Sequence, residues 1–222
     1  MKVITYTGKG LRNQNEDYAI CKEIADGKTL MIVADGMGGY VCGAEAAKIV
    51  AESIARSLAN GEHDDLASAI GCANNALASF KKQKGIENTG CTVAGVIASE
   101  TLVRVFWAGD SRVYIIRDGR IIYETQDHSL VNEMKKVRVL TPEQICRYEN
   151  IVRRAIMGEV TDVVDCDDVE IRKGDEILIC SDGLYKDMPV EAVLLRIRKE
   201  GDAFKVDGNK FEDNHTLIYA VV

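Results

Sequence analysis

The sequence predicts an α+β fold in which antiparallel sheets form the centre and helices pack on the outside. Strand-like apolar segments come in runs joined by short turns, and two helical segments follow one another between these runs. A parallel doubly wound sheet requires strands and helices to alternate one by one. The sequence lacks that alternation, so antiparallel sheets are expected.

The first strands are expected at residues 1–6, 18–21 and 29–34. Asp26-Gly27 lies between the second and third of these and is expected to be a hairpin turn. The third segment is a nearly continuous apolar run, which is typical of a strand that is buried on both faces. Residues 29–34 are therefore expected to form a central strand, with 18–21 as its hairpin neighbour.

Two helices are expected next. One runs from Gly43 to Asn60 and is ended by Gly61, and the other begins near Asp64 and continues to about Phe80. Apolar residues recur at spacings of three and four in both segments, which places them on one stripe of each helix. Each helix should therefore cover one face of a sheet.

The rest of the chain returns to strands. They are expected at 92–98, 102–108, 113–117, 120–125, 163–171, 176–180 and 216–222, with a helix at about 189–199. Asp118-Gly119 is the turn of a further hairpin. Residues 127–158 carry mixed charge and no strand pattern, and Thr141-Pro142 is a typical helix start. We interpret 127–158 as a partly helical insertion.

Composition narrows the possible functions. The 222 residues are 46% hydrophobic and have no linker-like tract, so we expect one domain over residues 1–222. The net charge of −7, without a basic patch, argues against nucleic-acid binding. No apolar segment approaches the roughly 20 residues of a membrane span, and none at the N-terminus resembles a signal peptide. The seven scattered cysteines indicate reduced thiols, so we expect a cytoplasmic protein. We also expect a monomer.

The most informative residues are aspartates near strand ends. Asp17, Asp35, Asp182 and Asp213 lie where apolar strands end or in terminal turns, and Asp110 closes another strand. Carboxylates that are brought together out of water repel one another unless a cation lies between them. This pattern predicts a hard cation. An Asp-Gly dipeptide is also a common turn, and that alternative stays open for Asp35 and Asp182.

The residue types indicate which cation to expect. The chain has only three histidines, none paired at metal spacing, so zinc is a poor candidate. Oxygen ligands favour Mg²⁺ or Mn²⁺, and an aspartate that bridges two ions roughly 3.5–4 Å apart is suited to phosphate-ester hydrolysis. Arg12 lies just upstream of Asp17, and its guanidinium is suited to phosphate binding. For a lone arginine, a surface ion pair is the alternative.

Together these motifs resemble one family. The matching segments are Arg12-Asn13-Gln14-Asn15-Glu16-Asp17, Asp35-Gly36-Met37-Gly38-Gly39, Gly90-Cys91-Thr92, Gly109-Asp110-Ser111-Arg112, Asp127-His128-Ser129-Leu130-Val131, Ser181-Asp182-Gly183-Leu184 and Asp213-Asn214. Their order and spacing are similar to those of the metal-dependent serine/threonine protein phosphatases (type 2C, or PPM), in the compact bacterial form. The resemblance implies two packed antiparallel sheets flanked by helices, an α-β-β-α sandwich with a metal site at one end.

The resemblance also implies roles for individual residues. Asp35 would bridge two Mg²⁺ or Mn²⁺ ions, and Gly36 would offer its backbone carbonyl. Asp17 would hold one ion, and Asp182 and Asp213 would hold the other.

Further roles follow from the same resemblance. Asp110, with Asp182, would hold a weaker third ion. Glu16 would hold metal-bound water in place without binding the ions itself, and Arg12 would bind the substrate phosphate. Residues 127–158 would form a flap beside the active site. The implied reaction is direct attack of metal-activated water on phosphoserine or phosphothreonine in proteins that a serine/threonine kinase has phosphorylated.

Some positions depart from the family pattern. Met37 stands where animal members often have a histidine that is proposed as the acid for the leaving group, and methionine cannot donate a proton. His128 and His215 are expected to be structural rather than replacements for it. The region between Ser181 and Asp213 is short, and the polar segment 201–211 stands in place of most of the family's helix before Asp213-Asn214. This predicts a sheet that is partly exposed or covered by a partner.

Two other functions remain open at this point. One is a catalytically silent protein that binds phosphoproteins as a regulator, which loss of metal aspartates would indicate. The other is a phosphatase whose substrate is an anti-sigma-factor antagonist, which differs in substrate rather than in chemistry.

Overall fold

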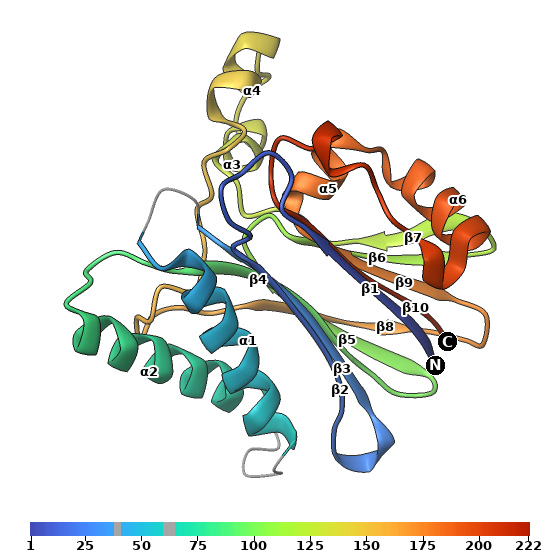
Figure 1. Ribbon diagram of the computed structural model, residues 1–222, viewed down its shortest axis with the longest axis horizontal. Helices are drawn as coiled ribbons and strands as arrows, with labels where there is room; N and C mark the ends of the chain where they lie inside the picture. The colour runs from blue at the N-terminus through green and yellow to red at the C-terminus, as the bar shows by residue number, and fades with distance from the viewer. Residues whose placement is uncertain (38–40, 60–64) are drawn as a thin grey trace.

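The structure is a computed structural model that describes residues 1–37, 41–59 and 65–222. Within those residues, strands form two five-stranded sheets that pack face to face, and every pairing within them is antiparallel (Figure 1). The first sheet has the order β1 (Lys2–Gly8), β10 (His215–Val221), β9 (Glu176–Cys180), β6 (Arg112–Arg117) and β7 (Arg120–Glu124). The second has the order β2 (Asp17–Glu23), β3 (Thr29–Gly36), β4 (Cys91–Ala98), β5 (Leu102–Ala108) and β8 (Asp165–Glu170).

This arrangement confirms the predicted fold class. The faces that the two sheets turn toward each other are filled by branched aliphatic side chains, including Val33 and Val105 from the second sheet and Ile177 and Ile218 from the first. The hairpin at Asp26-Gly27 is also confirmed, because both residues have positive φ and β2 pairs with β3 along its whole length. The apolar sandwich interior fixes the positions of the strand ends.

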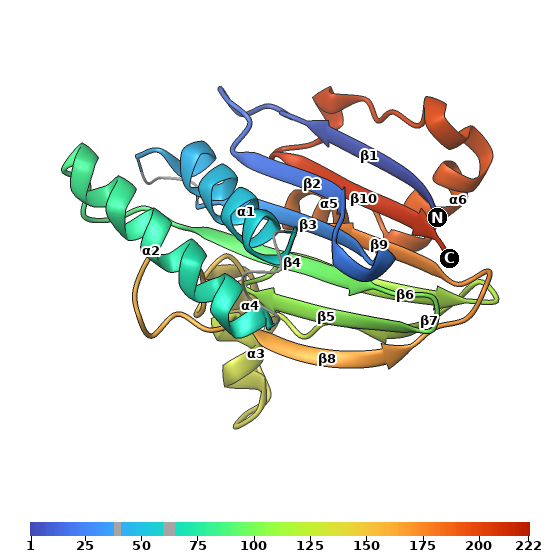
Figure 2. The ribbon, with the colours of Figure 1, turned by 90° about the horizontal axis from the view of Figure 1, so that it is seen from below.

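Helices α1 (Gly43–Ala59) and α2 (Leu66–Lys84) lie on the outer face of the second sheet (Figures 1 and 2). The predicted apolar stripe of α2 is buried in a cluster shared with α1 and the sheet. The side chain of Asp65 caps α2 by accepting a hydrogen bond from the backbone N–H of Ser68. The residues expected to end the first helix and start the second, Asn60, Gly61 and Asp64, lie outside the described part of the chain.

Helices α5 (Asp182–Asp187) and α6 (Val190–Glu200) cover the outer face of the first sheet. The expectation that segment 201–211 leaves this sheet exposed or dependent on a partner is wrong. Its short 3₁₀ turns η2 (Gly201–Ala203) and η3 (Gly208–Lys210) alternate with buried Phe204, Val206 and Phe211. These apolar side chains cover the sheet in place of a helix.

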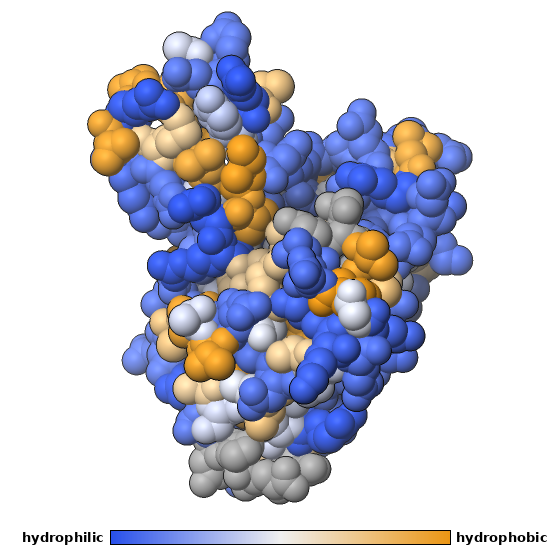
Figure 3. Space-filling view, turned by 90° about the vertical axis from the view of Figure 1, so that its left-hand side faces the viewer, coloured by the Kyte–Doolittle hydropathy of each residue, from blue (hydrophilic) through white to orange (hydrophobic). Residues whose placement is uncertain are grey.

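The flap, residues 127–158, contains the short helices α3 (Leu130–Lys135) and α4 (Pro142–Tyr148). The predicted start of α4 is confirmed, because Thr141 and Gln144 form a capping box. Figure 3 shows this region as a lobe that projects from the surface and carries apolar side chains, and Val137 and Val139 in its sequence are exposed. No helix in the described parts of the chain is long and apolar enough to cross a membrane.

Candidate active site

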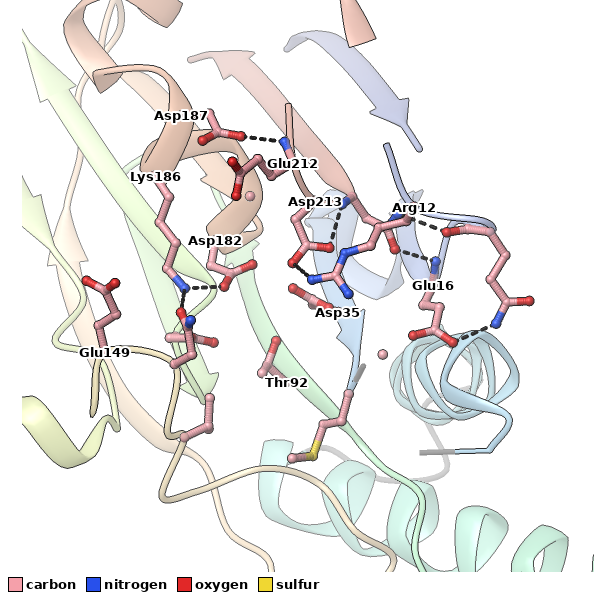
Figure 4. Close-up of a pocket in the computed structure, with 18 of the residues that line it drawn as sticks. Arg12, Glu16, Asp35, Thr92, Glu149, Asp182, Lys186, Asp187, Glu212 and Asp213 are labelled. Atoms are coloured by element: carbon pink, nitrogen blue, oxygen red, sulfur yellow. Dashed lines mark hydrogen bonds and ion pairs between the residues drawn. The ribbon is translucent and has the colours of Figure 1, made fainter. Parts of the chain in front are cut away.

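A cavity of about 940 Å³ opens at the end of the sandwich where β3 and β9 terminate (Figure 4). Most of the predicted site residues line it: Arg12, Glu16, Asp35, Gly36, Asp110, Asp182 and Asp213. Asp17 is not on the cavity surface. The flap contributes Glu149, Asn150 and Val152 to the lining. The cavity therefore joins both sheets and the flap.

Strand register places Asp17 and Asp35 together. They are direct cross-strand partners in the β2–β3 pair, and Asp35 is also opposite Thr92 on β4. Directly opposed residues point to the same face of a sheet, so the two carboxylates are neighbours. One carboxylate oxygen of Asp17, Oδ2, accepts a hydrogen bond of 2.7 Å from the Ser181 hydroxyl. The other, Oδ1, is buried and has no hydrogen-bond partner.

The carboxylates raise one another's pKa. Burial raises the pKa of Asp17 to about 7, against the opposing effect of the Ser181 hydrogen bond, and the charges of Asp182 and Asp213 add to the increase. Burial and then the charges of Asp17, Asp182 and Asp110 raise the pKa of Asp35 well above its usual range. For Asp110, burial and then Asp182 raise the pKa to about 7. A cation at this cluster would relieve both causes.

Two glycines bring the backbone segments of the site close together. A Cβ atom on Gly36 would lie 2.5 Å from the backbone of Gly43, at the start of α1. A Cβ atom on Gly183 would overlap the carbonyl oxygen of Asn214. These approaches explain why glycine follows Asp35 and Asp182, and they make these two Asp-Gly pairs different from the exposed turn at Asp26-Gly27.

Two basic side chains hold the outer carboxylates. Arg12 donates from Nη2 to Oδ2 of Asp213 at 2.6 Å, and Lys186 donates from Nζ to Oδ2 of Asp182 at 2.6 Å (Figure 4). Partial burial lowers the pKa of Lys186, but the charge of Asp182 and their hydrogen bond raise it overall. Sequence reasoning missed Lys186. The available signal was its spacing of four residues from Asp182, which places the two side chains on one face of α5.

The donor set fits a hard divalent cation, although the carboxylates are not gathered around one point. Among the described residues, no group of three acidic, histidine or cysteine side chains is arranged as a ready metal site. The hydrogen bonds above give the reason, because Asp213, Asp182 and Asp17 each turn one oxygen to Arg12, Lys186 or Ser181. The buried, unpartnered Oδ1 of Asp17 and the adjacent Asp35 are oxygen donors that a Mg²⁺ or Mn²⁺ ion would satisfy.

Asn214 holds the loop that carries Arg12. Its Oδ1 accepts a 2.8 Å hydrogen bond from the backbone N–H of Glu16, and its Nδ2 donates to the carbonyl oxygens of Lys9 at 2.8 Å and Gln14 at 3.0 Å. Asn214 is buried, so these contacts are shielded from water. The sequence showed the Asp213-Asn214 pair, but it did not show that Asn214 reaches across to this loop.

Glu16 connects the cavity lining to the end of β3. Glu16 lines the cavity, and its side chain accepts a 2.6 Å hydrogen bond from Gln14. Figure 4 shows it on the side of the cavity opposite Lys186. Its backbone carbonyl accepts a hydrogen bond from Gly36 N–H at 3.1 Å, which ties the loop to the end of β3. Glu16 thus supports the strand that carries Asp35.

Both predicted structural histidines have hydrogen-bond partners within the fold. His128 accepts a hydrogen bond from the Gly109 N–H at Nδ1 and contacts Asp165 through Nε2 at 3.0 Å. His215 donates from Nδ1 to the carbonyl oxygen of Asp213 at 3.1 Å. Neither lines the cavity. His215 therefore supports the backbone next to a candidate metal ligand.

In the metal-free protein, stability is expected to fall as pH rises from about 5 to about 7. Asp17 and Asp110 have folded-state pKa values of about 7, whereas the unfolded chain releases these protons near 3.8. The folded state therefore binds more protons across this interval, and raising the pH favours unfolding. Thermal midpoints measured in EDTA across this range check the prediction. Asp17→Asn should flatten the decline, and a midpoint that rises toward pH 7 would contradict it.

Comparisons with known proteins agree with the geometry. A family model described as protein phosphatase 2C matches residues 8–204. The serine/threonine phosphatase stp of Listeria monocytogenes serotype 4b (strain F2365) is 29% identical over 227 residues, covering 94% of this chain and 90% of that protein.

Solved structures give the same result. The crystal structure of the Mycobacterium tuberculosis serine/threonine phosphatase PstP/Ppp superposes with a TM-score of 0.82 at 26% identity, covering 100% of this chain and 98% of that one. The catalytic domain of the serine/threonine protein phosphatase PstP, in complex with 2 manganese ions, has a TM-score of 0.80 at 27% identity and covers 99% of this chain and 97% of that one.

Proposed function

Because the chain belongs to the protein phosphatase 2C family, we propose that it hydrolyses phosphoserine and phosphothreonine in proteins with the help of divalent metal ions. One observation carries the proposal: Asp17 and Asp35 are cross-strand neighbours with raised pKa values, and Asp35 lines a cavity that Arg12 also lines. Buried carboxylates of this kind are suited to hold Mg²⁺ or Mn²⁺. The arginine is suited to bind phosphate.

The acidic residues of the site would have different roles in metal binding. Asp35 would bridge two ions, with Gly36 beside it, while Asp17, Asp182 and Asp213 would hold them from the two sheets. Bound ions would supply charge neutralisation at the phosphate and a lowered pKa for water in the site. Glu16 would keep its loop against the end of β3. These roles need carboxylates from both sheets at one cavity, which is where Asp35, Asp182 and Asp213 lie.

Arg12 would bind and orient the phosphate oxygens. In the proposed reaction, water forms a bond to phosphorus in line with the serine or threonine oxygen, whose bond to phosphorus breaks. The leaving oxygen then takes up a proton. Met37 lines the cavity but has no proton to give, so this proton would come from solvent within the site. No phosphoenzyme is formed in this scheme.

The substrates proposed are cytoplasmic proteins phosphorylated by a serine/threonine kinase, acted on by a monomeric enzyme. A silent phosphoprotein-binding role is less well supported, because Asp17, Asp35, Asp182 and Asp213 are all retained around the cavity. A phosphorylated anti-sigma-factor antagonist would be bound and dephosphorylated by the same residues.

The direct test is phosphate release from a phosphothreonine peptide. We expect release that depends on Mn²⁺, stops in EDTA and is lost in Asp182→Ala. Circular dichroism would show that each protein is folded. Folded wild-type protein without metal-dependent activity would overturn the proposal, and activity that survives Asp182→Ala would overturn the assignment of the site.

Arg12→Ala is expected to lower kcat/KM for the peptide by about 10- to 100-fold, mainly through a higher KM. Hydrogen bonds to charged groups contribute about 1.5–3 kcal/mol, and each 1.4 kcal/mol corresponds to about tenfold. Arg12→Lys should retain part of the affinity, since it keeps the charge without the two-pronged geometry. Arg120→Ala, on β7 away from the cavity, is the matched control. An unchanged rate at low substrate would argue against phosphate binding by Arg12.

A further inference from the structure

Lys186 lies where the first sheet, the flap and the carboxylate cluster meet. Its Nζ donates to Asp182 Oδ2 at 2.6 Å and to the side-chain oxygen of Asn150, in the flap, at 2.9 Å. Figure 4 shows the Lys186 side chain running along the wall of the cavity to Asp182. Two hydrogen bonds from different segments fix the position of the ammonium group, so it is a defined part of the site.

The neighbouring Asp110 is a buried carboxylate of the same cavity. It is only 5% exposed, and among the residues that the structure describes its carboxylate has no ion-pair partner. The charged groups that act on it most strongly are Asp182, which is unfavourable, and Lys186, which is favourable. The Tyr185 hydroxyl donates to its backbone carbonyl at 2.9 Å and so holds this residue beside α5.

We propose that the Lys186 ammonium is a built-in cation that balances Asp110 and Asp182, so that these two carboxylates do not bind a divalent ion of their own. A metal ion there would have to displace Lys186 from Asp182 or lie close to its positive charge, and both are unfavourable in a partly buried site. This inference rests on the proposed metal-dependent function. It limits the metal centre to the ions held with Asp35.

The same geometry gives Lys186 a second effect. By bonding Asp182 and Asn150 together, it ties a candidate metal ligand to the flap without a metal ion. The lysine therefore links Asp182 to the flap, a link that a shared metal ion would otherwise have to provide.

The test is the number of Mn²⁺ ions bound per chain, measured by equilibrium dialysis and metal analysis. Wild-type protein and Asp110→Asn should each bind about two ions, the number of a two-metal site. Lys186→Asp replaces the cation with a third carboxylate and should bind about one ion more. Adding Asp110→Asn to Lys186→Asp should remove that extra ion.

Matched variants separate charge from folding. Lys186→Arg keeps a cation and should leave the ion count unchanged, and thermal unfolding would show that every variant is folded. The proposal is overturned if wild-type protein binds a third ion that Asp110→Asn removes. It is equally overturned if folded Lys186→Asp gains no ion.

The ion count is independent of phosphate release, so the two proposals fail in different ways. Wild-type protein that binds about two ions but releases no phosphate would overturn the proposed function and leave the role of Lys186 standing. Protein that releases phosphate but binds a third ion at Asp110 would overturn the role of Lys186 and leave the proposed function standing.

Discussion

Asp35→Asn is expected to reduce Mn²⁺-dependent phosphate release by about 10³-fold or more, while making the metal-free protein more stable at pH 7.5. Metal ions contribute several kcal/mol of charge stabilisation in such reactions, and each 1.36 kcal/mol corresponds to tenfold in rate. The gain in stability has a separate cause. Burial and three neighbouring aspartates raise the pKa of Asp35, so at neutral pH folding must either bury its charge or take up a proton, and asparagine removes this cost.

Two measurements on one variant test this prediction. Thermal unfolding in EDTA should show a higher midpoint for Asp35→Asn, and added Mn²⁺ should raise that midpoint less than it does for wild type, because ligand binding stabilises only a protein that binds it. Asp26→Asn is the matched control, since Asp26 begins an Asp-Gly turn that is exposed and remote from the cavity. If Asp35→Asn is active and Mn²⁺ stabilises it as much as wild type, Asp35 does not hold the metal.

Asn214→Ala is expected to have the largest effect on stability, lowering the free energy of unfolding by about 3 kcal/mol or more. The change leaves one backbone N–H and two carbonyl groups of the 9–16 loop without their partner. An unsatisfied buried polar group costs about 1–3 kcal/mol. Since the same loop carries Arg12, kcat/KM should also fall, even at a temperature where the variant is fully folded.

Urea unfolding and kinetics of the folded protein measure these two effects. Asn132→Ala is a suitable comparison, because that side chain donates one hydrogen bond, to the carbonyl of Asp127 in the flap. It should cost about 1 kcal/mol, in the range of one hydrogen bond. If Asn214→Ala costs no more than Asn132→Ala, Asn214 does not anchor the loop.

Much of the site could be predicted from the sequence because its residues terminate recognisable apolar runs. Asp35 follows the run in β3, and the hairpin at Asp26-Gly27 brings Asp17 to the opposite position. The register of a hairpin is set by its turn, so this pairing is local information. The same reasoning separates Asp35 and Asp182 from the exposed Asp26.

The contacts that sequence reasoning missed are those made between distant segments. Asn214 contacts Lys9 and Gln14 across nearly the whole chain, and no local pattern marks a residue for that role. Lys186 contacts Asn150 of the flap, and its spacing from Asp182 does not indicate that partner. The prediction that segment 201–211 leaves the sheet uncovered was wrong because the segment is mostly polar. The burial of its Phe204 and Phe211 depends on the adjacent sheet.

The proposed metal ligands come from both sheets, and this has a consequence for the folding pathway. Asp17 and Asp35 belong to the second sheet, while Asp182 and Asp213 adjoin strands of the first. Neither sheet contains the whole proposed metal centre, so an intermediate with only one sheet formed would have no complete set of ligands. The contacts that complete the centre join the two ends of the chain, and contacts of such large sequence separation form slowly. Metal binding should thus be acquired late in refolding, when the sheets dock, and the ion acts as a ligand of the finished sandwich rather than as a template for it.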